Sequence, residues 1–141
     1  MPVRSARATW KGGLKTGSGS FKTESGLSAA YNYSSRFGEE RASNPEELLA
    51  AAQASCFSMA LSSALEKNGT AATSIATNAK CAIDKVGEGF GITSLVLDVR
   101  VTAPGLNDET LKKLAEETKK SCPVSRALSG IRLDVTASIG G

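Results

Sequence analysis

The sequence predicts an α+β fold in which antiparallel β-strands pack on one long central helix. Two observations support this prediction. Residues 43–69 contain no charge from Leu48 to Leu65 and are rich in helix-favouring Leu and Ala. Several other segments alternate apolar and polar residues with a period of two, which is typical of strands with one buried face. We therefore expect one domain over residues 1–141, ordered as strands, long helix, hairpin, helix and strand.

The central helix has clear start and stop signals. Asn44 is a good N-cap residue, Pro45 suits the first helical position, and Glu47 stands at capping-box spacing from Asn44. Gly69 can end the helix in a left-handed conformation. Apolar residues occur on nearly every side, which predicts a helix that is buried all round. The uncharged run also reaches the lower length limit of a membrane span. Gln53 and several serines lower the hydrophobicity of this run, so a core helix is favoured over a membrane span.

The remaining elements are predicted from alternation and turn residues. Residues 7–33, rich in Gly, Ser and Thr, indicate antiparallel hairpin strands, and residues 34–42 indicate a charged connection. Residues 74–85 and 90–102 form the clearest hairpin. A helix follows from about Asn107 to Ser121. Beyond it we expect a short helix from Pro123 and a last strand at residues 131–137.

The composition limits the function classes. The chain has a net charge of +3, and only 5% of its residues are aromatic, so nucleic acid is not an expected partner. It has no histidine, which excludes Cys–His and Ser–His–Asp mechanisms within one chain and removes the commonest metal ligand. We expect neither a metal nor a cofactor. The N-terminal residues show no apolar signal region, so a reducing, cytoplasmic location without membrane attachment is the expectation.

The three cysteines differ in their predicted surroundings, and without CxxC spacing they predict neither a disulfide framework nor a zinc site. Cys81 lies on the apolar face of a strand and is expected to be structural. Cys56 lies in mid-helix among apolar residues, which should raise its thiol pKa unless a cation approaches. Cys122 precedes the Pro123 helix, whose free N–H groups favour a thiolate, and Arg126 is a possible nearby cation. By these arguments alone Cys122 is the more activated thiol.

Two longer motifs carry more specific information. They are NPEELLAAAQASCFSMAL around Cys56 and CPVSRAL beginning at Cys122. Together with TESG, RFGEE, SIAT, DKV and GITSLVL they resemble the OsmC/Ohr family of thiol-dependent hydroperoxide reductases, and more closely its OsmC branch. The resemblance covers nearly the whole chain. It implies the OsmC-like fold and an intertwined homodimer with active sites at the subunit interface.

The resemblance also implies four site residues. Cys56 matches the peroxidatic cysteine and Cys122 the resolving one, Arg36 matches an arginine beside the reactive thiolate, and Glu46 matches the carboxylate that orients this arginine. An arginine can depress a thiol pKa and stabilise charge that develops as the O–O bond breaks. The implied activity is reduction of organic hydroperoxides, and of hydrogen peroxide more weakly, through a Cys56 sulfenic acid and a Cys56–Cys122 disulfide. An external dithiol would restore both thiols.

Several alternatives remain open from the residues. Phe57, Met59 and Leu61 would suit the wall of an organic hydroperoxide site or simply the core. Glu46 and Cys56 are about 15 Å apart along one helix, so either Arg36 bridges them or a second subunit supplies Arg36 and Glu46. Arg36 is otherwise a solvated loop charge, and Glu46 a carboxylate that offsets the helix dipole. The rival function is a non-enzymatic ligand-binding or redox-sensing protein of the same fold.

Overall fold

The computed structural model describes residues 1–140. It divides into two compact units, Met1–Leu48 and a second unit that begins at Leu49. The boundary falls within the long helix α2 (Pro45–Lys67). The expectation of one domain over residues 1–141 stays a prediction.

The first unit is a three-stranded antiparallel meander followed by a short helix. Its strands are β1 (Ala6–Lys11), β2 (Ser18–Thr23) and β3 (Ser28–Tyr31), in the order β1-β2-β3. The strands predicted in residues 7–33 are confirmed. The stretch after them is not only a connection, because it contains the helix α1 (Tyr33–Phe37), which begins at a capping box.

Gly19 in β2 fixes how this small sheet packs its aromatic residues. The Trp10 and Tyr31 rings lie with centroids 5.6 Å apart, on the two strands that flank Gly19. A Cβ atom at Gly19 would lie 2.7 Å from an atom of each ring. Only glycine therefore lets the two rings close over the middle strand.

The ends of α2 agree with the sequence signals. The backbone N–H of Glu47 donates to the Asn44 side chain at 2.8 Å, so Asn44 is the predicted N-cap. The Glu47 carboxylate accepts a hydrogen bond from the Ser43 hydroxyl. Gly69 has φ +80°, the left-handed conformation expected after the helix.

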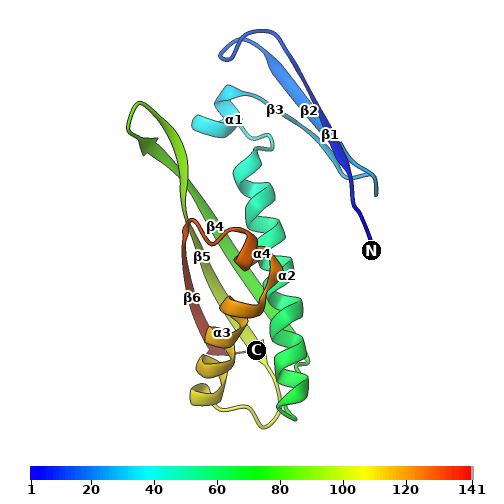
Figure 1. Ribbon diagram of the computed structural model, residues 1–141, viewed down its shortest axis with the longest axis vertical. Helices are drawn as coiled ribbons and strands as arrows, with labels where there is room; N and C mark the ends of the chain where they lie inside the picture. The colour runs from blue at the N-terminus through cyan, green and yellow to red at the C-terminus, as the bar shows by residue number, and fades with distance from the viewer. Residues whose placement is uncertain (141) are drawn as a thin grey trace. The chain divides into compact units, whose positions relative to one another are not determined.

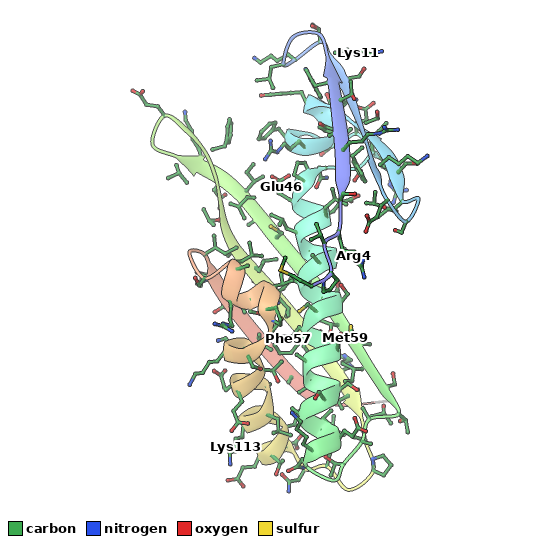
Figure 2. The ribbon with its side chains drawn as sticks, turned by 45° about the vertical axis from the view of Figure 1, so that its right-hand side comes forward. Arg4, Lys11, Glu46, Phe57, Met59 and Lys113 are labelled. Carbon is green, nitrogen blue, oxygen red and sulfur yellow. The ribbon has the colours of Figure 1, made fainter. Side chains whose placement is uncertain are left out.

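The prediction that α2 is buried all round is wrong for the single chain. In its middle and last turns the fully buried side chains form one stripe with a spacing of four residues: Gln53, Phe57, Leu61 and Leu65. Figure 2 shows Phe57 and Met59 on different sides of the helix, and Met59 is 77% exposed. The reason is that a single chain covers this helix on one face only.

The second unit is a three-stranded sheet with helices on one face (Figure 1). After the part of α2 that begins at Leu49, it contains β4 (Ser74–Val86), β5 (Gly89–Thr102), α3 (Asp108–Ser121), α4 (Pro123–Ala127) and β6 (Arg132–Ile139). The strand order is β4-β5-β6, and β4 and β5 form the predicted antiparallel hairpin. The β5–β6 pair is parallel, which corrects the prediction of antiparallel pairing throughout. The reason is that the connection through α3 and α4 returns the chain to the end of the sheet at which β5 begins. β6 therefore runs in the same direction as β5.

One face of β5 and the covering helices form the core of the second unit. The fully buried β5 side chains Leu97, Val99 and Val101 meet Leu61 of α2 and Leu111 of α3. The predicted alternation along β5 is confirmed. This core fixes α2 against the sheet, and α3 leads the chain back toward α2 at Cys122.

By length and composition, α2 passes the test for a membrane-crossing helix, with a mean hydropathy of 1.5 in its most apolar 18-residue window. Within the chain, 22% of that window is buried. A core helix of a protein in water passes the same test, so this feature alone is weak support for a membrane span.

Candidate active site

The two motif cysteines meet in the second unit. Cys56 lies in α2 and Cys122 lies between α3 and α4, and their Sγ atoms are 3.1 Å apart. This is hydrogen-bond distance for two sulfurs, and both side chains are free thiols. A disulfide needs about 2 Å, so the pair would have to move by about 1 Å to form one.

The local sequence explains the position of Cys122. The residue before a proline is disfavoured in the helical region, so α3 ends at Ser121 and Cys122 takes the extended conformation φ −60°, ψ 120°. Pro123 then starts α4. The N–H of Cys122 still donates to Thr118 at 2.8 Å, which ties the thiol to the last turn of α3.

The surroundings shift the two thiols in opposite directions. Burial raises the pKa of Cys56, the N–H of Val124 opposes this rise, and the hydrogen bond and negative charge of Cys122 raise the pKa further. Burial also opposes ionisation of Cys122, yet its pKa is lowered by the hydroxyl and N–H of Ser125, by the Cys56 thiol and by the N–H of Val124. Cys122 is thus the more acidic thiol of the pair, as the sequence indicated.

Of the two influences that the sequence suggested for Cys122, the N–H groups at the start of α4 lower its pKa, whereas Arg126 is not among the groups that do so. Arg126 is exposed, and the start of α4 and the Ser125 hydroxyl act in its place. A fully buried carboxamide completes this surrounding: Nε2 of Gln53 lies 2.7 Å from the Ser125 Oγ and 3.7 Å from the Cys122 Sγ. Neither Gln53 nor Ser125 was identified as a candidate site residue from the sequence.

Arg36 and Glu46 meet in the first unit. Arg36 Nε donates to the two carboxylate oxygens at 3.0 and 3.3 Å, and Nη2 donates to Oε1 at 2.8 Å. The Glu46 side chain is 7% exposed and that of Arg36 is 36% exposed. Arg36 is therefore held in an ion pair and is not the solvated loop charge that the alternative described. Because the ion pair and the cysteines belong to different units, contact between Arg36 and Cys56 stays a prediction.

Three further candidates lie in or near the core. Phe57 and Leu61 are fully buried core residues, which favours the core alternative over a substrate wall for both. Cys81 of β4 is half-buried and packs against the core, in keeping with a structural thiol. Within residues 1–140 no group of three or more His, Cys, Asp or Glu side chains could hold a metal ion.

Comparison with known proteins decides the family. Residues 38–136 match the family model described as OsmC-like protein. Peroxiredoxin OsmC of Escherichia coli is 42% identical over 134 residues, which cover 93% of this chain and 94% of that protein. The chain belongs to the OsmC family.

Solved structures agree with this assignment to the OsmC family. An organic hydroperoxide resistance protein from Elizabethkingia anophelis has a TM-score of 0.77 at 26% identity and covers 99% of both chains. An organic hydroperoxide resistance protein OsmC from Legionella pneumophila has a TM-score of 0.74 at 25% identity over the whole of both chains. The predicted OsmC-like fold is therefore confirmed.

The OsmC-family sequence held weak signals for the two residues that were missed. Gln53 is a large polar residue inside an uncharged helical run, one turn before Cys56 on the same side of the helix. Ser125 follows Cys122 by three residues, the spacing at which a side chain in the first turn of a helix can reach back to the N-cap residue. Neither signal is specific alone, and only the fold brings them to one sulfur.

Proposed function

We propose that this protein is a two-cysteine peroxidase that reduces organic hydroperoxides to alcohols in defence against oxidative and osmotic stress. Cys56 is the peroxidatic residue and Cys122 the resolving residue in this proposal. The observation that supports it most directly is the 3.1 Å distance between their sulfur atoms in a chain of the OsmC family.

The enzyme class rests on the family and on the relatives. The chain is a peroxidase-type enzyme, since its relatives are named peroxiredoxin OsmC and organic hydroperoxide resistance protein. The proposal adds two points to this enzyme class: a preference for organic hydroperoxides over hydrogen peroxide, and the two-cysteine route.

The atoms that change bonds in the proposed reaction are those of the two thiols, the peroxide and the reductant. The Cys56 thiolate attacks one peroxide oxygen, the O–O bond breaks, and the alkoxide leaves and takes up a proton to become the alcohol. Cys56 is then a sulfenic acid. The Cys122 thiolate attacks the Cys56 sulfur, forms the disulfide and expels hydroxide, which becomes water. An external dithiol reduces the disulfide by exchange.

The raised pKa of Cys56 creates a requirement that Arg36 would meet. Burial and the neighbouring Cys122 disfavour the Cys56 thiolate within the second unit. A guanidinium beside the sulfur would favour the anion and stabilise the alkoxide as it leaves. Arg36 is already fixed by the Glu46 carboxylate through its Nε and Nη2. We propose that this fixed guanidinium serves Cys56, of its own chain or of a second subunit.

The homodimer is part of the same proposal. The side of α2 that carries Met59 is exposed in the single chain although the helix is apolar. A second copy would remove that apolar surface from water. The remaining parts are an external dithiol as the electron donor and a reducing cytoplasmic location, with no nucleic acid or membrane as a partner.

The test is dithiol-dependent consumption of an alkyl hydroperoxide by the wild type and by single cysteine variants. We expect Cys56→Ser and Cys122→Ser to lose turnover, and Cys81→Ser to keep it. Cys122→Ser should still consume one equivalent of peroxide and form a Cys56 sulfenic acid. Wild type that is oxidised once without turnover would favour redox sensing, and loss only in Cys81→Ser would refute the site.

A further inference from the structure

The buried carboxamide of Gln53 is the least expected polar group of the second unit. Gln53 is 0% exposed, and its Oε1 has no hydrogen-bond partner among residues 1–140. A buried acceptor without a partner destabilises the fold, because it has lost its hydrogen bonds to water. An apolar side chain of similar volume would therefore fill this place without that cost. In contrast, the Nε2 atom of the same carboxamide has two partners, the Ser125 Oγ and the Cys122 Sγ.

The contacts of Gln53 fix the direction of the Ser125 hydroxyl. Nε2 of Gln53 donates to the Ser125 Oγ at 2.7 Å. Because the Oγ lone pair accepts this bond, the hydroxyl proton is free to point to the Cys122 sulfur. Nε2 also lies 3.7 Å from that sulfur, so both groups present donors to it. The Ser125 hydroxyl is among the groups that lower the pKa of Cys122.

The two sulfurs differ in access. Cys122 is 0% exposed, whereas Cys56 is half-buried. A dithiol from solution would therefore attack the Cys56 sulfur of a Cys56–Cys122 disulfide. Cys122 is then the leaving sulfur, and a thiol of lower pKa leaves faster in thiol–disulfide exchange.

We propose that Gln53 and Ser125 are positioning residues that stabilise Cys122 as the leaving thiolate when an external dithiol reduces the Cys56–Cys122 disulfide. This inference rests on the proposed function and adds the direction of its reducing step. It also gives a reason for a carboxamide in the core: its Nε2 serves the negative charge of the Cys122 thiolate, which the disulfide lacks and its opening creates.

One thiolate of the dithiol attacks the Cys56 Sγ, the Cys56–Cys122 bond breaks, and its electron pair passes to the Cys122 Sγ. The products are a mixed disulfide on Cys56 and the Cys122 thiolate. The second thiolate of the dithiol attacks the reductant sulfur of the mixed disulfide and releases the Cys56 thiolate. The dithiol is oxidised to a cyclic disulfide, and the protein gains two electrons.

The experiment separates reduction from oxidation. The disulfide is formed with diamide, and its reduction by dithiothreitol is followed in wild type, Gln53→Met and Ser125→Ala. Met has a similar volume and no donor, so the fold should hold. We expect both variants to be reduced roughly tenfold more slowly, the worth of one hydrogen bond to a charged group. Ser125→Thr keeps the hydroxyl and should restore the rate, and the exposed control Ser62→Ala should match wild type.

A second measurement addresses the direction of attack in the unaltered protein. Reduction of the wild-type disulfide by glutathione is stopped with an alkylating reagent, and the adduct is located by mass spectrometry. We expect the adduct on Cys56. An adduct on Cys122 would overturn the inference.

Three other outcomes would overturn either this inference or the proposed two-cysteine function. Unchanged reduction rates in Gln53→Met and Ser125→Ala would overturn the inference. Equal slowing of peroxide oxidation and of reduction, with a lowered Tm, would overturn it too by assigning Gln53 a structural role. If peroxide forms no disulfide in the wild type, the proposed two-cysteine function fails, while the diamide-formed disulfide still tests Gln53.

Discussion

Arg36 and Glu46 form a forked ion pair in which the carboxylate is almost fully buried and the guanidinium is partly open. Two guanidinium nitrogens donate to the carboxylate, at distances from 2.8 to 3.3 Å. The Glu46 side chain is 7% exposed, against 36% for Arg36. The carboxylate thus anchors the arginine and leaves part of it free to meet another group, which suits a cation that assists a thiolate.

The ion pair can be tested with charge-removing and charge-keeping variants. Glu46→Gln removes the anchor, and Arg36→Lys keeps a cation but loses the fork. We expect peroxide turnover to fall roughly tenfold or more in both, with a stability loss of about 1 kcal/mol for this partly exposed pair. The matched control is Glu47→Gln, one residue along, whose carboxylate accepts a hydrogen bond from Ser43. Control and test variants with equal turnover would contradict the role of Glu46.

The coupling of the two thiols predicts a pH effect. Burial and then the neighbouring Cys122 raise the pKa of Cys56. Replacing Cys122 by Ser removes the negative neighbour, so the Cys56 pKa should fall and its alkylation by iodoacetamide should begin at a lower pH. Conversely, Cys56→Ala removes a donor from Cys122 and should raise the Cys122 pKa. Mass spectrometry assigns each alkylation rate to its cysteine. Cys81→Ser should leave the pH profiles of Cys56 and Cys122 alkylation unchanged. Profiles that do not move would mean that the thiols are not coupled.

The exposed side of α2 predicts the effect of a charge on assembly. Met59 is 77% exposed in the single chain, and a carboxylate there would be costly to bury against a second copy. We expect Met59→Glu to shift the protein from a dimer to one chain in sedimentation or light scattering. The control is Lys113→Glu, an exposed charge on α3 (Figure 2). A wild type that sediments as one chain would refute the dimer.

The two faces of β5 predict different mutational costs. Leu97 is 0% exposed within the core, and Val96, the preceding residue, is 39% exposed on the opposite face. Leu97→Ala should lower the free energy of unfolding by about 3 kcal/mol. Val96→Ala should change it by less than about 1 kcal/mol. Urea unfolding measures both, and equal losses would contradict the assigned faces.

Much of the fold was predictable because local chemistry controls it. Asn44 and Gly69 set the ends of α2, and the alternation through Leu97 and Val99 identified the buried face of β5. The parallel pairing of β6 was not predictable in this way. Alternation shows which face of a strand is buried, but it does not show the direction of the neighbouring strand. That direction depends on how α3 and α4 return the chain.

The sequence by itself determined the family, the order of the elements apart from α1, and the two cysteine motifs, because these depend on residue types at fixed spacing. It also indicated that Cys122 is the more acidic thiol, because Pro123 starts a helix beside it. Only the tertiary structure decided that Cys56 and Cys122 meet at 3.1 Å and that Gln53 and Ser125 surround the second sulfur. Those contacts join residues some seventy positions apart, and their formation depends on the packing of α2, α3 and the sheet rather than on any local preference.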